Sequence, residues 1–228
     1  MALYRRVALI GLGLIAGSMG LAIRRAGLAD EVVGTARTPE SRAVALERGL
    51  CDRVTETAAQ AVEGADLVVL ATPVGAMEAV AAEIAPQLSP GAVVTDVGSV
   101  KQAVIDAVAP HLPEGVVLLP GHPIAGTEQS GPRSGFATLF EGRWCILTPL
   151  PDTPEAEVVR LSALWEGMGA RVDLMDPEHH DTVLAVTSHV PHLTAYTIVG
   201  VADDLRRVTD SEVVKYSAAG FRDFTRIA

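Results

Sequence analysis

Short apolar runs alternate with stretches of helical periodicity over the first three quarters of the chain. Unbroken apolar runs are typical of strands that are buried on both faces of a parallel sheet. The expected strands cover residues 5–10, 31–35, 66–71, 92–96, 116–119, 143–148 and 170–175. Five helices are expected. They run from the glycines at 11–13 to residue 27, over residues 39–48, from about residue 72 onward, from about residue 102 to residue 112, and over residues 153–168. This alternation predicts an α/β protein with a doubly wound, mostly parallel sheet.

The pattern changes at Asp176-Pro177, which we interpret as a domain boundary. Beyond it the chain reads as continuous helix, and this helical part opens with four histidines. We therefore expect one domain over residues 1–176 that contains the sheet. Residues 177–228 are expected to form the start of an all-α domain.

The first predicted strand leads into Gly11-Leu-Gly-Leu-Ile-Ala16, a dinucleotide fingerprint of the G-x-G-x-x-A form. Gly11 permits the tight turn, Gly13 lets the backbone approach a pyrophosphate, and Ala16 keeps the next helix close to the strand. The N-terminus of that helix would then face the phosphates. The context predicts a Rossmann-type domain whose cofactor-binding residues include Gly11, Leu12, Gly13, Leu14, Ile15 and Ala16.

The net charge and the positions of the cysteines limit the partners and the compartment that we expect for this protein. The formal net charge is −10 at pH 7, whereas nonspecific nucleic-acid binding needs a basic surface, so we do not expect a nucleic-acid partner. The apolar run after the first two arginines is too short and too glycine-rich for a membrane span, and it lacks the cleavage site of a signal peptide. Cys51 and Cys145 stand far apart, as expected of two thiols in a reducing cytoplasm.

The segment His122-Pro-Ile-Ala-Gly-Thr-Glu-Gln-Ser-Gly131 combines an imidazole with hydroxyls, a carboxylate and residues that break helices. An imidazole exchanges protons near neutral pH, and the side chains of Thr127, Glu128 and Ser130 can orient a ligand. We therefore expect a site loop rather than part of the core. The alternative is a polar connection with one incidental histidine.

Four candidate residues directly follow predicted strands. Gly11, Thr72, Ser99 and His122 each come at or just after the end of an apolar run. The carboxyl ends of parallel strands form one edge of a sheet, and ligands bind there in open α/β folds. The spacing therefore brings all four to one crevice, where Thr72, Pro73 and Ser99 are expected to contact the cofactor.

Five motifs together resemble the prephenate and arogenate (cyclohexadienyl) dehydrogenase family, and the resemblance covers nearly the whole chain. The motifs are Gly11-Leu-Gly-Leu-Ile-Ala-Gly-Ser18, Asp96-Val-Gly-Ser-Val-Lys101, the segment from His122 to Gly131, Ser188-His-Val-Pro-His192 and Gly220-Phe-Arg-Asp-Phe-Thr-Arg-Ile-Ala228. Generic β-hydroxyacid dehydrogenases share the fingerprint and the Thr-Pro turn. They are not expected to combine the histidine segment with His-x-x-His.

The resemblance implies an NAD(P)-dependent oxidoreductase of tyrosine biosynthesis. Its reaction would be the oxidative decarboxylation of prephenate to 4-hydroxyphenylpyruvate, of arogenate to tyrosine, or of both. The ring carbon that bears the hydroxyl would lose a hydride to nicotinamide, and the ring carboxylate would leave as carbon dioxide. By the same resemblance His122 accepts the hydroxyl proton, Ser99 bridges histidine, substrate and nicotinamide, and Arg226 binds a substrate carboxylate.

His189 and His192 lie three residues apart and share a helix face if Pro191 falls in the first turn. The resemblance places both histidines, with Thr127 and Glu128, at the substrate pocket, although Glu128 is equally consistent with a solvated loop carboxylate. One alternative is a pair of histidines that cap or pack the helix. Another is a metal site built from His179, His180, Asp181, His189 and His192, but we expect no metal ion.

The end of the second predicted strand departs from the usual pattern of NAD enzymes. These enzymes commonly place an acid there to bind the ribose diol, whereas this chain has Thr35-Ala-Arg-Thr38. Arg37 and the threonine hydroxyls can accept a 2′-phosphate, which slightly favours NADP or dual use over NAD. The alternative is that Arg37 stacks on the adenine of NAD.

The C-terminal end is a second departure from the family pattern. In the family, further helices follow the Phe-Thr-Arg-Ile-Ala segment, complete the substrate pocket and form a homodimer, whereas this sequence ends at Ala228. We therefore expect a fragment or a shortened homologue that binds dinucleotide but turns over prephenate poorly. The competing hypothesis is a catalytically weak dinucleotide-binding module. The chain contains candidate catalytic and candidate substrate-binding residues together. This favours the enzyme hypothesis, because a binding module does not need them.

Overall fold

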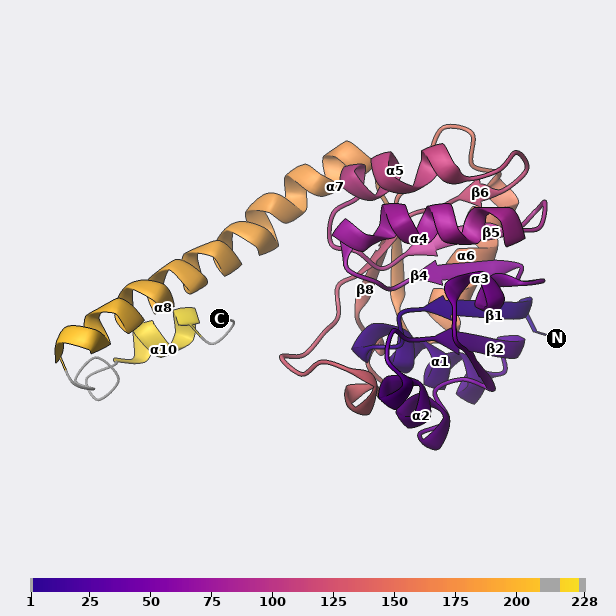
Figure 1. The fold of residues 1–228 in the computed structure, drawn as a ribbon. Coiled ribbons are helices and arrows are strands. Elements are labelled where there is room, and N and C mark those ends of the chain that lie inside the picture. The colour runs from indigo at the N-terminus through magenta and orange to yellow at the C-terminus, as the bar shows by residue number, and fades with distance from the viewer. Residues whose placement is uncertain (1, 210–217, 226–228) are drawn as a thin grey trace. The chain divides into compact units, whose positions relative to one another are not determined.

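The computed structural model describes residues 2–209 and 218–225 of the chain, in two compact units, Met1–His180 and Asp181–Ala228 (Figure 1). The first unit is built on a parallel sheet with the strand order β3-β2-β1-β4-β5-β6. Its strands are β1 (Tyr4–Ile10), β2 (Ala29–Thr35), β3 (Arg53–Thr55), β4 (Leu67–Leu70), β5 (Val93–Asp96) and β6 (Val117–Leu118). The chain runs outward from the central β1 in both directions, which confirms the doubly wound α/β fold.

Helices cover both faces of this sheet (Figure 1). They are α1 (Leu14–Ala26), α2 (Pro39–Glu47), α3 (Ala58–Val62), α4 (Met77–Ile84), α5 (Gln102–Val108) and α6 (Glu155–Gly167). Leu9 and Val69 belong to a hydrophobic core with α1 and α6, whereas Val68 and Val94 belong to a second core with α3, α4 and α5. The central strands are therefore apolar on both faces, which explains their unbroken apolar runs.

A second sheet of three strands completes the first unit. Its strands are β7 (Gly121–Pro123), β8 (Trp144–Leu147) and β9 (Arg171–Leu174). β7 runs antiparallel to β8, with His122 opposite Ile146, and β8 runs parallel to β9. The prediction that His122 belongs to a loop outside the core is therefore wrong, because His122 is a buried strand residue. Residues 124–131, which follow it, form neither helix nor strand.

Besides β7, the strand β3 and the helix α3 of the first unit have no counterpart among the predicted elements. α3 begins with a capping box, in which the Thr57 hydroxyl accepts from the Gln60 amide and the Gln60 side chain accepts from the Thr57 amide. Both elements are too short for hydrophobic periodicity to reveal them. The other predicted strands and helices of this unit are confirmed, with small shifts at their ends.

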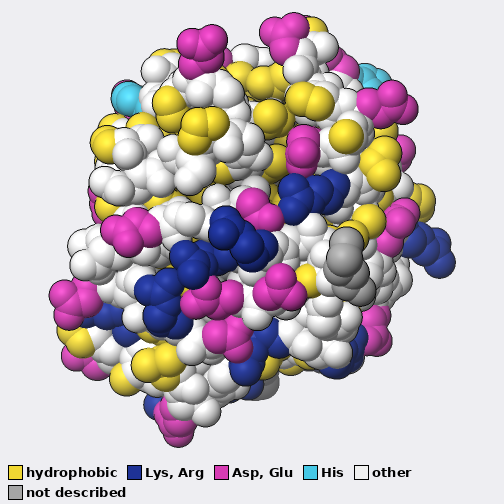
Figure 2. All heavy atoms as spheres, turned by 90° about the vertical axis from the view of Figure 1, so that its right-hand side faces the viewer, with side chains coloured by type: hydrophobic (Ala, Val, Ile, Leu, Met, Phe, Trp, Pro, Cys, Tyr) yellow, Lys and Arg dark blue, Asp and Glu magenta, His cyan; other side chains and the backbone are white. Residues whose placement is uncertain are grey.

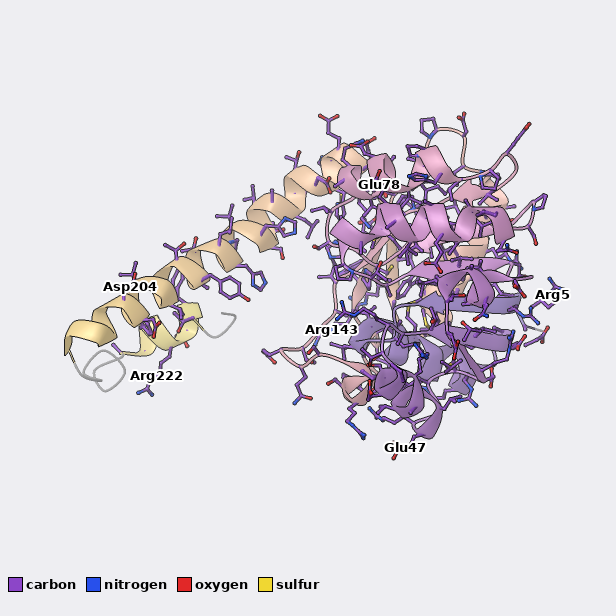
Figure 3. All side chains as sticks on the ribbon, viewed as in Figure 1. Arg5, Glu47, Glu78, Arg143, Asp204 and Arg222 are labelled. Atoms are coloured by element: carbon purple, nitrogen blue, oxygen red, sulfur yellow. The ribbon has the colours of Figure 1, made fainter. Side chains whose placement is uncertain are left out.

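The second unit is helical in its described residues. Its elements are the end of α7 (Pro177–Leu184), a π-helical turn η5 (Ala185–His189), α8 (Val190–Thr209) and α10 (Ala219–Thr225). The π turn comes just before Pro191, whose ring displaces the carbonyl one turn earlier and which has no N–H to donate. α10 packs on α8, and Arg222 projects from α10 away from α8 (Figure 3). None of the helices in the described part of the chain is both long and apolar enough to cross a membrane.

Charged side chains of both signs are interspersed over the face shown in Figure 2, at the amino ends of the strands. Glu31 accepts from Arg6 at 2.5 Å and from Arg53 at 3.3 Å. Asp66 accepts from Arg160 at 2.9 Å. Such partly exposed pairs contribute little stability, but they neutralise these guanidinium groups locally.

Gly20 of α1 is a position where the backbone leaves no room for a side chain. A Cβ atom on Gly20 would lie 1.8 Å from the carbonyl oxygen of Leu50. We expect Gly20→Ala to lower the free energy of unfolding by about 1 to 3 kcal/mol, as other overpacking substitutions do. Gly200→Ala in α8 is the matched control, because no atom lies within 4 Å of its Cβ position. Unfolding of both variants in denaturant would measure the difference in the free energy of unfolding. If Gly20→Ala were as stable as the wild type, the close approach of the two backbones would be contradicted.

Candidate functional site

A cavity of about 620 Å³ opens at the carboxyl ends of the central strands. It is lined by residues from the ends of β1, β2 and β4 and by the segment that follows β3. Of the predicted cofactor residues, the lining includes Gly11, Arg37, Thr72 and Pro73. The cavity therefore lies at the sheet edge where ligands bind in open α/β folds.

The first glycine of the fingerprint, Gly11, lines this cavity. Gly11 has φ of 99°, and a Cβ atom there would lie 2.8 Å from the carbonyl oxygen of Ala71. Gly13 is the N-cap residue of α1, and no atom lies within 4 Å of its Cβ position. The first backbone N–H groups of α1 thus face a side of the loop that a phosphate can approach closely. Leu12 and Ala16, in contrast, bury their side chains in the core, so only their backbones are available to a cofactor.

Thr72 supplies a test of whether this site fits a dinucleotide. Among the described residues, its hydroxyl is one of a few buried side-chain polar atoms that have no hydrogen-bond partner. A buried hydroxyl without a partner is costly, and Thr72 also lines the cavity, so a ligand oxygen or ribose hydroxyl can satisfy it. The orphaned hydroxyl, the open Gly13 and the N-terminus of α1 together fit a dinucleotide.

Asp96 and Lys101 form a fully buried ion pair at the next strand end, with 2.5 Å between Nζ and Oδ2. The amide of Gly98 donates to Oδ2 of Asp96, and the amide of Gly121 donates to Oδ1. Lys101 Nζ also donates to the carbonyl of Gly121 at 2.5 Å. Burial raises the pKa of Asp96, and the Lys101 ammonium and the two amides oppose that rise. This pair therefore joins the turn that carries Ser99 to the strand that carries His122.

Asp96 and Lys101 were not among the predicted site residues. Both residues belong to the motif Asp96-Val-Gly-Ser-Val-Lys101, and this motif was the sequence signal that could have identified them. A charged pair directly after a buried strand indicates either a ligand site or a structural link. The structure shows a structural link, because the polar atoms of the pair bind each other and the backbone of Gly98 and Gly121.

His122 is 8% exposed and makes a side-chain hydrogen bond to a second histidine. Its Nδ1 lies 2.9 Å from Nε2 of His180, which is in the first half of α7 and fully buried. The two rings meet edge to face, with centroids 5.1 Å apart. In the sequence, His180 was considered only as a metal ligand. Among the described residues, no three histidine, cysteine or acidic side chains are arranged to hold a metal ion.

The segment after β7 carries two further candidates, Thr127 and Glu128, both exposed. The Thr127 hydroxyl accepts from the amide of Gln129 at 3.2 Å. Further along, Arg48 donates to backbone carbonyls of residues 132, 133 and 135, and the amide of Phe136 donates to the Ser18 hydroxyl of α1. The loop is thus anchored at both ends, to β8 at one end and to the fingerprint helix at the other.

Three predicted substrate residues lie outside the first unit. His189 ends the π turn and has a buried Nε2 without a hydrogen-bond partner among the described residues. His192 is exposed in the first turn of α8 and stacks on Tyr196, with ring centroids 6.5 Å apart. Arg226 lies outside the described residues. Their assignment to a substrate pocket stays a prediction.

Two family descriptions match the chain. The nucleotide-binding domain of prephenate dehydrogenase matches residues 19–174, and the dimerization domain of prephenate dehydrogenase matches residues 176–228. Among curated relatives, the cyclohexadienyl dehydrogenase of Zymomonas mobilis is 42% identical over 100% of this chain and 78% of its own length. The prephenate dehydrogenase of Bacillus subtilis is 36% identical over 97% of this chain, which spans only 60% of that relative.

Solved structures show the same similarity. The prephenate dehydrogenase of Aquifex aeolicus, in complex with hydroxyphenyl propionate and NAD+, superposes with a TM-score of 0.87 at 36% identity. That comparison covers 98% of this chain and 77% of the other chain. Synechocystis arogenate dehydrogenase superposes with a TM-score of 0.81 at 28% identity, over 97% of this chain and 78% of its own.

Proposed function

Because this chain belongs to the prephenate dehydrogenase family, we propose that it is an NAD(P)-dependent dehydrogenase that oxidatively decarboxylates prephenate, arogenate or both. The observation that carries the proposal is the buried His122, which the Asp96–Lys101 pair holds in place beside the turn that carries Ser99. The names of the relatives, which include cyclohexadienyl, prephenate and arogenate dehydrogenases, support these substrates. A binding module would not need such a fixed imidazole.

In the proposed reaction, the chain's own residues handle the proton and the orientation of the substrate. His122 accepts the proton of the ring hydroxyl, so that the carbon–oxygen double bond can form. Ser99 hydrogen-bonds the same oxygen and helps to hold the ring. The bound nicotinamide supplies the acceptor for the hydride from that ring carbon. The bond to the ring carboxylate then breaks and carbon dioxide leaves, while the electron pair of that bond enters the ring. The carbon–oxygen double bond returns to a single bond, and the oxygen takes up a proton again, so that the product is a phenol.

The proposal predicts formation of reduced nicotinamide when the chain is mixed with prephenate or arogenate. We would follow the absorbance of reduced nicotinamide with each substrate and with NAD or NADP in turn. A simple β-hydroxyacid is the control, because generic relatives of that type share the fingerprint. Oxidation of the hydroxyacid alone would contradict the proposed substrates. A shortened enzyme should turn over prephenate or arogenate slowly, whereas dinucleotide binding with no turnover of either substrate would favour the binding module.

The preference between NAD and NADP is decided at the end of β2. Ala36 and Arg37 line the cavity, and the segment 35–38 offers no carboxylate to a ribose diol. We expect Ala36→Asp to lower the ratio of NADP to NAD catalytic efficiency, because a carboxylate there repels a 2′-phosphate and accepts from the ribose hydroxyls. Ala36→Asn is the uncharged control. If the ratio did not fall in Ala36→Asp, this assignment of the 2′ position would be wrong.

The domain boundary, the assembly and the compartment belong to the same proposal. We place the boundary between the nucleotide-binding and helical domains at Asp176-Pro177. A homodimer is supported by the family description of residues 176–228 and by exposed apolar side chains on α8, namely Val190, Leu193, Tyr196 and Val201.

A reducing cytoplasm suits the two free, buried cysteines. Burial raises the pKa of Cys51 to about 11, which keeps this thiol protonated and unreactive.

A further inference from the structure

The hydrogen bond between His122 and His180 constrains the protonation state of both rings. It joins two imidazole nitrogens, Nδ1 of His122 and Nε2 of His180, at 2.9 Å. Such a bond requires one N–H and one lone pair, because two lone pairs or two N–H groups repel each other. Each neutral imidazole carries a single N–H, so the direction of this bond decides which ring nitrogen of His122 can accept a proton.

We propose that His180 is a positioning residue that fixes the tautomer of His122. In this arrangement Nδ1 of His122 carries the hydrogen and donates it to Nε2 of His180. The other nitrogen of His122, Nε2, then presents its lone pair to the substrate hydroxyl. The opposite direction would put the hydrogen on Nε2 of His122 and turn the base into a donor. The proposal rests on the proposed function, in which His122 accepts the hydroxyl proton.

The position of His180 in α7 supports this direction of the bond. His180 is the fourth residue of α7, and its amide donates to the carbonyl of Asp176 in the first helical turn. The Asp176 side chain accepts from the amides of Glu178 and His179, which caps the helix and fixes this turn. The N-terminal end of a helix disfavours a cation, so a proton taken up by the pair stays on His122 rather than on His180.

Uptake of the hydroxyl proton strengthens the same bond. Once His122 carries both hydrogens, its Nδ1–H donates from a cation to the neutral His180, and charge-assisted bonds of this kind are the stronger ones. His180 thereby stabilises the charge that develops on His122 during the reaction. Asp96 and Lys101, which bind the backbone of Gly121 beside His122, compensate each other's charge.

The experiment compares His180→Leu, which removes the acceptor, with His180→Gln, whose amide oxygen stands close to the lost Nε2. We expect kcat of His180→Leu to fall about 10- to 100-fold with little change in KM or in the Kd of the dinucleotide, as for other groups that orient a functional imidazole. His180→Gln should recover most of kcat. His179→Leu is the matched control, because His179 is the exposed neighbour on the same helix, and its kcat should stay at the wild-type value.

Nitrogen-15 spectra of the imidazoles give a readout that does not depend on turnover. The signals of His122 are assigned as those that disappear in His122→Asn. In the wild type these signals should show the hydrogen on Nδ1, and in His180→Leu they should show it on Nε2. A hydrogen on Nε2 of His122 in the wild type would overturn the proposal. Equal losses of kcat in His180→Gln and His180→Leu would also overturn it. If neither substrate is oxidised, the proposed function fails, while the spectra still decide the role of His180.

Discussion

Replacing His122 with asparagine is expected to lower kcat with prephenate or arogenate by about two to four orders of magnitude, the usual contribution of a general base. Asparagine can still donate to His180 from nearly the position of Nδ1, so the strand and the neighbouring helix should keep their places. It has no group that can take up the hydroxyl proton. Dinucleotide affinity should stay at the wild-type level, because the cavity is lined by other residues.

The measurement combines steady-state kinetics with a separate titration of the dinucleotide. His111→Asn is the matched control, since His111 lies after α5 and its Nε2 is 3.9 Å from a carboxylate oxygen of Glu78. The control should retain wild-type kcat. Turnover of His122→Asn close to that of the wild type at neutral pH would remove His122 from the mechanism.

Replacing Lys101 with methionine is expected to lower the free energy of unfolding by about 3 to 5 kcal/mol at neutral pH, because it leaves the Asp96 carboxylate buried without its partner. Methionine has nearly the length of lysine, so the loss comes from charge rather than from volume. The carbonyl of Gly121 would lose its donor as well, next to His122. We therefore expect a lower kcat in the variant that remains folded.

The pH dependence of this loss follows from the pKa of Asp96. Burial raises this pKa in the folded protein, and removal of the ammonium raises it further. Above the pKa of the unfolded chain, at about 4, the folded state binds the additional proton, so stability falls as the pH rises toward the folded value. The penalty of Lys101→Met should therefore shrink when unfolding is measured at acid pH.

Two further variants make this prediction specific. Asp96→Asn combined with Lys101→Met removes both charges and should recover much of the lost stability, because no unpaired buried charge remains. Arg143→Met is the surface control, since Arg143 is exposed and projects outward beside β8 (Figure 3). If Lys101→Met lowered the free energy of unfolding no more than Arg143→Met does, the buried pair would not stabilise the fold.

The sequence predicted most of the first unit because its signals are local. An apolar run buried on both faces, a glycine that requires positive φ at Gly11 and a helix end at Gly27 each depend on a few neighbouring residues. The same locality identified the fingerprint, the cavity edge at Thr72 and the absence of an acid at residues 35–38. β3 and α3 were missed because elements of three to five residues carry too little periodicity.

What the sequence determined about this protein by itself is the doubly wound sheet, the dinucleotide fingerprint and the family to which its motifs point. Tertiary structure alone decided the surroundings of His122. Its strand pairs with β8, Lys101 reaches the carbonyl of Gly121, and His180 meets its ring from a residue 58 positions away. These contacts join segments that are distant in the chain, and no periodicity or local propensity encodes which of them meet. Only the packing of the complete unit brings the second imidazole to the first.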